Sequence, residues 1–198
     1  MSRAHPLPPQ ERRQSIVAAV IPLLMGKGAA VTTREMAEAA GVAEGTIFSV
    51  FEDKTELIRT AIATAVDPRR VVEALGEIHH GTTLEAQLTE AARILTERLD
   101  VFYAMAPLLR SSVNPKSRGS ARTKMMEANA TIRAALTDLF ERHADHLRVT
   151  PTKAAAAFSS AVSSGRFVWL PAEERMAVDE VVDTFLFGVT KRVMAGRA

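Results

Sequence analysis

Small and polar side chains are mixed with apolar ones in the segment GVAEGTIFSVFEDK, which spans residues 41–54. Val42, Ile47 and Phe51 have the spacing of one helix face, and we expect this face to pack against neighbouring helices. The residues between them then face outward, where their hydroxyl, carboxylate and backbone groups can meet the donors and acceptors on base edges in the major groove of DNA. The outward residues are Glu44, Gly45, Thr46, Phe48 and Ser49.

The short helix expected over about residues 43–50 is not stable by itself, so other elements must hold it. The segment before it, TTREMAEAAG, has a helix N-cap in Thr32 or Thr33 and ends at Gly41, which suits the positive φ of a tight turn. A longer helix is expected to begin near residues 9–11 and to end in MGKGAA, residues 25–30. Three helices with a glycine turn between the second and the third form a helix-turn-helix arrangement, whose last helix enters the major groove.

Helical spacing continues through the rest of the chain, while strand signals are nearly absent. A fourth helix begins near Lys54 and runs toward DPRR, residues 67–70, where the proline ends or bends it. The cluster SSVNPKSRGS, residues 111–120, predicts a loop. We therefore expect an all-α protein, with further helices at about residues 83–100, 101–109, 121–147, 151–168 and 173–194.

The composition excludes several kinds of catalytic and metal site. The chain has no cysteine among its 198 residues, so it has no disulfide, thiolate zinc site, iron–sulfur cluster or cysteine nucleophile. His143 and His146 lie one helical turn apart, but no third metal ligand has a convincing spacing. The sequence also has no nucleophile motif and no glycine-rich phosphate loop. We therefore expect no enzyme, no metal and no cofactor.

The sequence also bears on where the protein is found. No run of about 18 apolar residues occurs, so no membrane span is expected. The first residues, MSRAHPLPPQERRQ, lack the apolar centre of a signal peptide. Together with the absence of cysteine, these features predict a cytoplasmic protein.

Aromatic and methionine side chains gather in the middle of the sequence. Most of them belong to the core of a helical bundle, but as a set they would also line an apolar cavity between helices. Tyr103, Arg110 and Asn129 would then supply polar anchors for a small-molecule ligand. The apolar candidates for this ligand site are Phe102, Met105, Met126, Phe158 and Trp169.

The last two expected helices fit a homodimer interface. Small side chains between residues 154 and 165 permit helices to approach closely, and an apolar stripe on the last helix would be costly to leave in water. In the alternative arrangement, both stripes close onto the core of the same subunit. The interface candidates are Ala157, Ala161, Val178, Val182, Phe185 and Val189.

The segment TTREMAEAAGVAEGTIFSVFEDKTELI, residues 32–58, resembles the DNA-binding core of the tetracycline-repressor (TetR) family of bacterial regulators. The match extends over about residues 10–65. The resemblance implies an N-terminal helix-turn-helix DNA-binding domain over residues 1–55, and a C-terminal helical domain over residues 56–198 that binds a ligand and dimerises. The matching positions are Thr33, Met36, Ala37, Ala40, Gly41, Val42, Gly45, Thr46, Ile47, Phe51, Lys54 and Leu57.

The resemblance also implies the roles of individual residues. Thr33 and Lys54 would contact phosphates of double-stranded operator DNA, Lys54 from the positive N-terminus of the fourth helix. Gly45 and Thr46 would lie at the groove. Phe48 stands where the family usually has a tyrosine whose hydroxyl bonds a phosphate, so this contact is expected to be missing.

Other features of the segment are unusual for a DNA-binding domain. Residues 1–66 hold seven Lys or Arg and seven Asp or Glu, so their formal charge is balanced, although phosphate neutralisation normally drives affinity. Glu44 would repel phosphate unless it accepts a hydrogen bond from a cytosine amine. Val50 replaces an aromatic residue or histidine that is frequent in the family, and Arg34 adds a further candidate phosphate contact.

These features predict a homodimeric transcriptional repressor that a small-molecule effector releases from its operator. One alternative is a regulator of the same fold that activates transcription or has no effector. Another is a non-catalytic ligand-binding protein, or a helical enzyme, whose N-terminal bundle is only structural. An enzyme would place polar catalytic groups in the central cavity, and the sequence offers few.

Overall fold

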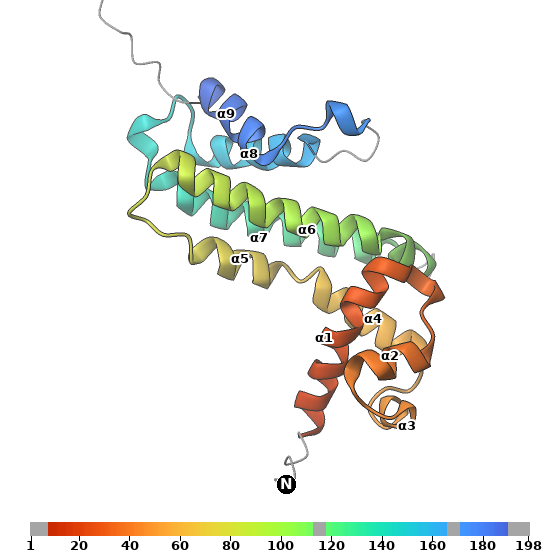
Figure 1. The fold of residues 1–198 in the computed structure, drawn as a ribbon. Coiled ribbons are helices and arrows are strands. Elements are labelled where there is room, and N and C mark those ends of the chain that lie inside the picture. The colour runs from red at the N-terminus through yellow and green to blue at the C-terminus, as the bar shows by residue number, and fades with distance from the viewer. Residues whose placement is uncertain (1–7, 113–117, 166–170, 190–198) are drawn as a thin grey trace, which may run out of the picture. The chain divides into compact units, whose positions relative to one another are not determined.

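The computed structural model describes residues 8–112, 118–165 and 171–189, and Figure 1 draws their helices in colour. Within these ranges the regular elements are α-helices and short 3-10 helices, and no β-strand is present. This confirms the all-α prediction.

Contacts between residues divide the chain into two compact units. The N-terminal unit comprises residues 1–67 and 101–119, and the C-terminal unit comprises residues 68–100 and 120–198. Helix α6, Leu84–Ser112, contributes its first part to the C-terminal unit and its last part to the N-terminal unit.

Four helices build most of the N-terminal unit, and their ends follow from residue chemistry. The first helix begins at Pro9, because a proline at the first position has no amide hydrogen to leave unbonded, and it ends where Gly28 has a φ of 60°. It continues through Pro22, which lacks the N–H that would bond the carbonyl of Ala18. The helices are α1 (Pro9–Lys27), α2 (Thr33–Ala40), α3 (Glu44–Phe48) and α4 (Lys54–Ala65).

Most of these helix boundaries agree with the sequence prediction, but α3 is shorter than expected. It ends at Phe48, whereas its pattern predicted a helix to about residue 50. In the N-terminal unit α1 packs on α2 and α4, and α2 packs on α3. Its buried core consists of Ile16, Val17, Val20, Leu24, Val31, Met36, Ala37, Ile47, Phe51, Leu57, Ala61, Ile62, Met105 and Leu108.

The C-terminal unit has one apolar core to which each of its helices contributes. At the centre of this core, the rings of Phe140, Phe158 and Phe185 lie 5.1 to 5.9 Å apart, centroid to centroid. Edge-on ring pairs at this distance add to the stabilisation that burial gives. Besides the first part of α6, the unit contains α5 (Pro68–Gly76), α7 (Arg118–Glu141), of which residues from 120 on belong to it, α8 (Pro151–Gly165) and α9 (Val178–Val189).

Gly165 permits the close approach of α8 to the chain that leads into α9. A Cβ atom at this position would lie 3.0 Å from Cγ2 of Val181, which is closer than carbon atoms normally approach. The small residue near the end of α8 therefore has a packing role inside one subunit.

The helices beyond α4 differ from the predicted ones at two prolines, Pro68 and Pro107. Pro68 starts α5, a helix that was not predicted, because proline suits the first helical turn as well as the end of a helix. Pro107 does not divide α6, which is one helix and not the two that were predicted. The last helix begins at Val178 instead of Glu173, since residues 172–174 form a 3-10 turn. Its predicted end at about residue 194 lies outside the described residues.

In the part of the chain that the structure describes, no helix has both the length and the hydropathy that a membrane span requires.

Candidate nucleic-acid interface and ligand site

The start of α2 is held by reciprocal hydrogen bonds. Thr32 Oγ1 accepts from the backbone N–H of Glu35 at 3.2 Å, and the carboxylate of Glu35 accepts from the N–H of Thr32 at 2.8 Å. Lys27 Nζ donates to the same carboxylate at 2.6 Å. The Lys27 ammonium, together with the bonds from Thr32, lowers the pKa of Glu35 to about 2. This capping box fixes where α2 begins.

The turn between α2 and α3 depends on glycine. Gly41 has a φ of 63°, in the left-handed region, and its N–H points back to the last carbonyls of α2. The N–H of Val42 donates to the carbonyl of Ala37 at 3.0 Å and closes the helix end. A residue with a Cβ would be strained in this conformation, so the glycine that was predicted at the turn is required there.

One face of α3 is buried and the other is open to solvent. Ile47 is fully buried and Phe51 nearly so, while Val42 is half-buried against the same core, which confirms the predicted apolar face. Figure 1 shows α3 as a short coil at the outer edge of its unit, beside α2. Of the outward candidates, Glu44, Gly45, Phe48 and Ser49 are exposed and Thr46 is half-buried.

Phe48 and Ser49, two of the outward residues, have different surroundings. The ring of Phe48 is 50% exposed, so no core contact explains a large apolar side chain at this position. Ser49 Oγ donates to the carbonyl of Thr46 at 2.7 Å and closes the last turn of α3. Ser49 therefore supports the helix end, and its hydroxyl oxygen can still accept a hydrogen bond.

Arg13 of α1 holds the segment that connects α3 to α4, and the sequence prediction missed it. Its Nη1 donates to the carbonyl of Val50 at 2.7 Å, and its Nη2 donates to Glu56 at 2.6 Å and to Thr60 at 3.3 Å. Its guanidinium also lies 4.2 Å from the ring centroid of Phe51. The partners are 37 to 47 residues away in the sequence, so no local pattern could have identified this contact.

The N-terminus of α4 combines a cap with a basic side chain. Asp53 accepts from the N–H of Glu56 at 2.7 Å, and Glu56 accepts from the N–H of Glu52 at 2.6 Å. The Arg13 guanidinium, followed by the Glu52 amide, lowers the pKa of Glu56. Two of the acidic residues near α3 therefore serve structural bonds. Lys54 Nζ makes no hydrogen bond or ion pair with the described residues, so it is available to an anion.

The remaining phosphate-contact candidates lie in the first turn of α2. Thr33 is its first residue and is half-buried, and Arg34 follows it on the surface. Arg34 Nε lies 3.0 Å from Glu38, and both side chains are largely exposed. An exposed pair of this kind is weak, so phosphate can compete for Arg34.

The candidate ligand residues are divided between the two units. Phe102, Tyr103 and Met105 belong to the N-terminal unit, where Met105 is fully buried in the core and the other two rings form a T-shaped pair at 6.0 Å. Arg110 lies in α6, and its side chain is outside the described residues, as is Trp169.

The other ligand candidates belong to the C-terminal unit. Phe158 is fully buried in the aromatic core, which leaves it no free face for a ligand, whereas Met126 is 60% exposed. Asn129 Oδ1 accepts a hydrogen bond from Arg98 Nη2 at 2.9 Å. Arg98 was not among the candidates, although its position on α6 is half-buried and burial lowers the pKa of its guanidinium.

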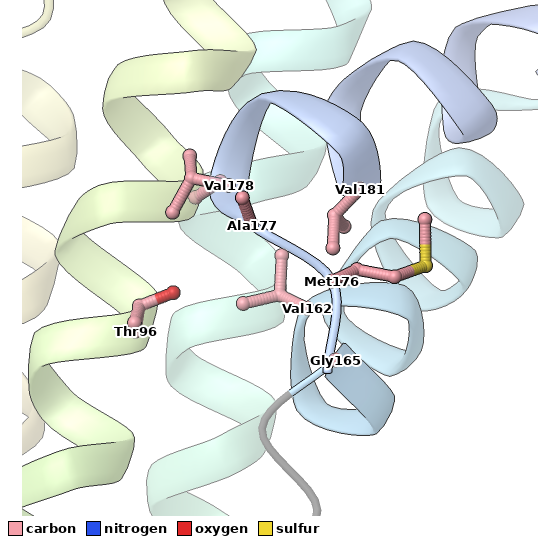
Figure 2. Close-up of a pocket in the computed structure, with 8 residues that line it drawn as sticks. Thr96, Val162, Gly165, Met176, Ala177, Val178 and Val181 are labelled. Atoms are coloured by element: carbon pink, nitrogen blue, oxygen red, sulfur yellow. The ribbon is translucent and has the colours of Figure 1, made fainter. Parts of the chain in front are cut away.

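A small cavity is present in the C-terminal unit, beside the turn that precedes α9. Its volume is about 60 Å³ and its walls are mostly apolar. Figure 2 shows the hydroxyl of Thr96 on the α6 side of this space, opposite Val162 of α8. None of the predicted ligand residues lines it. The walls are Ala92, Thr96, Val162, Gly165, Met176, Ala177, Val178 and Val181.

The candidate dimer residues fall into two groups, and two of them need correction. Val182 and Phe185 are buried in the core of their own subunit, because the apolar stripe of α9 packs on α8 and the aromatic cluster. The remaining candidates are partly open: Ala161 and Val178 are half-buried against the same core, Ala157 is exposed, and the side chain of Val189 is outside the described residues.

An exposed apolar side chain lies on the other face of α9. Phe187 is 76% exposed, and it was not among the interface candidates. Sequence spacing did not reveal it, because α9 is apolar on more than one face.

The two histidines have different surroundings. His143 Nε2 lies 3.1 Å from Oε1 of Gln87, which is itself buried, whereas His146 is exposed. Burial, with help from Arg142 and His146, lowers the pKa of His143. Among the described residues, no group of three or more His, Asp or Glu side chains could hold a metal ion.

A comparison with protein families gives a match to the N-terminal unit. Residues 16–61 match the sequence model of the family described as bacterial regulatory proteins, tetR family. This range contains the capping box, the glycine turn, α3 and the first turns of α4. Among curated proteins, none matches the chain.

Solved structures share the fold over nearly the whole chain. A TetR transcriptional regulator from Streptomyces coelicolor has a TM-score of 0.58 at 20% identity, covering 91% of this chain and 99% of that chain. A transcriptional regulator from Rhodococcus sp. Rha1 has a TM-score of 0.58 at 23% identity, covering 89% and 97%. NalD, the secondary repressor of the MexAB-OprM multidrug efflux pump in Pseudomonas aeruginosa, has a TM-score of 0.52 at 18% identity, covering 92% and 98%. At these identities, the likeness shows the fold.

Proposed function

We propose that this chain is a DNA-binding transcriptional regulator of the tetR family of bacterial regulatory proteins, whose sequence model matches residues 16–61. It is a homodimeric repressor that a small-molecule effector releases from its operator. It acts on double-stranded DNA in the cytoplasm, and it has no catalytic role.

The observation that carries the proposal is the open face of α3. Its inner face is buried by Ile47 and Phe51, while Glu44, Gly45 and Phe48 are left exposed with no structural task inside the unit. A helix held by its core in this way can offer its outer side chains to the major groove. Thr46 is the candidate for a base contact, since its hydroxyl both donates and accepts.

The contacts to phosphate come from helix N-termini. Thr33 begins α2 and Lys54 begins α4, and the amide groups in the first turn of a helix favour an anion such as phosphate. Lys54 is free to form an ion pair with a phosphate, and Arg34 adds a weaker one by leaving Glu38. Phe48, which has no hydroxyl, contacts a sugar or a thymine methyl instead.

The homodimer is proposed to form through the exposed faces of α8 and α9. Ala157 on α8 and Phe187 on α9 are exposed apolar residues of these helices, and association would remove them from water. A twofold axis would place two α3 helices about 34–36 Å apart, which is one turn of DNA.

The effector is proposed to act by preferring one of two states. A ligand shifts an equilibrium only when it binds the DNA-free state more tightly than the DNA-bound state. The cavity of about 60 Å³ beside Thr96 is far smaller than the roughly 300–1,000 Å³ of drug-sized ligand sites. An effector must therefore enlarge it or bind at another place in the C-terminal unit.

A gel-shift experiment tests the proposal. The purified full chain is titrated against the intergenic fragments that neighbour its own gene, with an unrelated fragment of equal length as competitor. We expect one fragment to be retarded at moderate salt and the competitor to be displaced first as salt rises, because its binding is electrostatic alone. If no neighbouring fragment is retarded, the proposed function is wrong.

A further inference from the structure

We propose that Arg98 of α6 and Asn129 of α7 form an anchor for the carboxylate group of a small molecule with an apolar body, which is the effector of this regulator. The inference depends on the proposed function for its regulatory consequence, but the binding itself does not require DNA.

The guanidinium of Arg98 is held between two helices with too few partners. Nη2 donates to Asn129 Oδ1 at 2.9 Å, while Nε is buried and has no hydrogen-bond partner among the described residues. A buried donor that bonds neither protein nor water costs free energy, and a buried charge without a counter-charge costs more. This position is therefore unfavourable for arginine unless something else binds it.

No acidic side chain of the described residues neutralises Arg98. Glu97, which precedes Arg98 in the sequence, is paired with Arg93. The pKa of Arg98 is lowered by burial alone, with no compensating charge. An anion from outside the chain would supply both the missing charge and the missing acceptor.

The side-chain NH₂ group of Asn129 adds further hydrogen-bond donors beside Arg98. Arginine only donates hydrogen bonds, so the amide oxygen of Asn129 must face Arg98 and its NH₂ group must face away. This NH₂ group has no partner among the described residues. A carboxylate, which only accepts, matches an unbonded Nε–H and an unbonded NH₂. A single cation beside a neutral amide also fits a singly charged carboxylate better than a doubly charged phosphate.

The surroundings of the pair suit an apolar ligand body. One turn before Asn129 lie Met125 and Met126, which are 44% and 60% exposed. Methionine side chains are flexible and polarisable, so an exposed pair of them adapts to ligands of different shape.

The experiment observes Arg98 directly in the full-length protein. The ¹H–¹⁵N spectrum of the arginine Nε–H groups is recorded with octanoate and benzoate, and with octanamide and benzamide as uncharged controls. The Arg98 signal is assigned by its loss in Arg98→Lys. We expect at least one carboxylate to shift this signal at millimolar concentration while its amide does not. The proposal is overturned if neither carboxylate shifts it, if the amide shifts it equally, or if inorganic phosphate alone does so.

Two variants give an independent measurement. Arg98→Met removes the anchor, and Arg133→Met removes an exposed arginine one turn beyond Asn129 on α7. We expect the dissociation constant of the carboxylate to rise about 10- to 100-fold in Arg98→Met, because a charge-assisted hydrogen bond is lost. In Arg133→Met the dissociation constant should stay within about twofold of its original value.

The melting temperature without ligand separates an anchor from a structural arginine. When no ligand is bound, an anchoring arginine keeps a buried charge without a partner, which costs free energy. The variant Arg98→Met removes this cost, so it should melt at the same temperature as the original chain or higher. A lower melting temperature together with unchanged carboxylate binding would overturn the proposal. The gel shift needs no carboxylate, so an absence of carboxylate binding at Arg98 would leave the proposed function intact. In the same way, an absence of DNA retardation would leave the carboxylate-binding result intact.

Discussion

The two units each contain an arginine that connects neighbouring helices, and the two guanidinium groups differ in how many of their donors have hydrogen-bond partners. The guanidinium of Arg13 in the N-terminal unit contacts a backbone carbonyl, a carboxylate, a hydroxyl and the face of Phe51. Arg98 in the C-terminal unit has one neutral partner and a buried Nε with none.

This difference corresponds to different tasks. An arginine that bonds several elements fixes the geometry of the elements that it joins, and the DNA-reading helix α3 must be fixed because it is only five residues long. An arginine with unused donors cannot hold its helices as firmly, and its free energy improves when a ligand binds. We therefore expect the loss of Arg13 to affect folding and DNA binding together, and the loss of Arg98 to affect neither.

The largest effect is expected for Arg13→Ala. The loss of its bonds to Val50 and Glu56 and of its ring contact should lower the free energy of unfolding by about 2–3 kcal/mol, since the side chain is partly screened by water. Operator affinity should fall as well, because the end of α3 is released. Urea unfolding and gel shift measure the two quantities. The matched control Arg34→Ala breaks only an exposed pair and should cost less than about 1 kcal/mol.

The second pair of variants compares two glycines, one from each unit. In Gly165→Ala the new methyl group would meet Val181 at 3.0 Å, and overpacking of this kind costs about 1–3 kcal/mol. In Gly45→Ala no atom lies within 4 Å, so stability should change by less than about 1 kcal/mol. Operator affinity should nevertheless fall in Gly45→Ala, because the methyl group faces the groove. Equal DNA binding of Gly45→Ala and the original chain would show that α3 does not enter the groove at this position.

A smaller gain is expected for Phe48→Tyr. The ring is half exposed, so the added hydroxyl should not disturb the core. If it reaches a phosphate, operator affinity should rise about 3- to 10-fold, the value of one hydrogen bond. Fluorescence anisotropy with labelled operator DNA measures this change. A loss of affinity would indicate that Phe48 lies against an apolar part of the DNA that excludes a hydroxyl.

The smallest effects are expected from pH, and they should differ between the units. The lowered pKa of Glu35, about 2 instead of 4.5, means that its stabilising bonds are fully present above pH 4.5 and are lost as the pH falls toward 2. In the C-terminal unit the lowered pKa of His143 favours its neutral form in the folded state. That contribution is complete above pH 6.5 and declines as the pH falls below this value.

Thermal melts between pH 7 and pH 2 would separate these contributions. In His143→Gln, which can still bond to Gln87, the early decline in melting temperature below pH 6.5 should be reduced. In Glu35→Gln the decline below pH 4.5 should be reduced. A profile that neither substitution changes would mean that other groups control the acid sensitivity.

The features that the sequence revealed are local ones. Thr32 caps α2 through a residue three positions away, and Gly41 adopts the positive φ that a tight turn requires. The buried face of α3 follows from the spacing of Val42, Ile47 and Phe51. Such features depend on residues within one or two helical turns, so their patterns can be read without a tertiary structure.

The features that were missed depend on contacts between distant segments. Nothing near Arg13 or Arg98 in the sequence distinguishes them from exposed arginines, because their partners lie 31 to 47 residues away. The stripe of Val182 and Phe185 predicted an apolar contact but not its partner, which is the core of the same subunit. Pro68 allowed both a helix end and a helix start, and only tertiary packing decides between them.

The central claim is that α3 reads DNA sequence while the start of α4 binds phosphate. It is tested most directly by measuring the affinity of Thr46→Ala and Lys54→Ala for the operator and for a scrambled sequence over a range of salt concentrations. We expect Lys54→Ala to weaken both duplexes alike and to reduce the salt dependence by about one phosphate contact. We expect Thr46→Ala to change the ratio of the affinity for the operator to the affinity for scrambled DNA. If both variants weaken the two duplexes uniformly, or if neither has an effect, α3 and Lys54 do not have these roles.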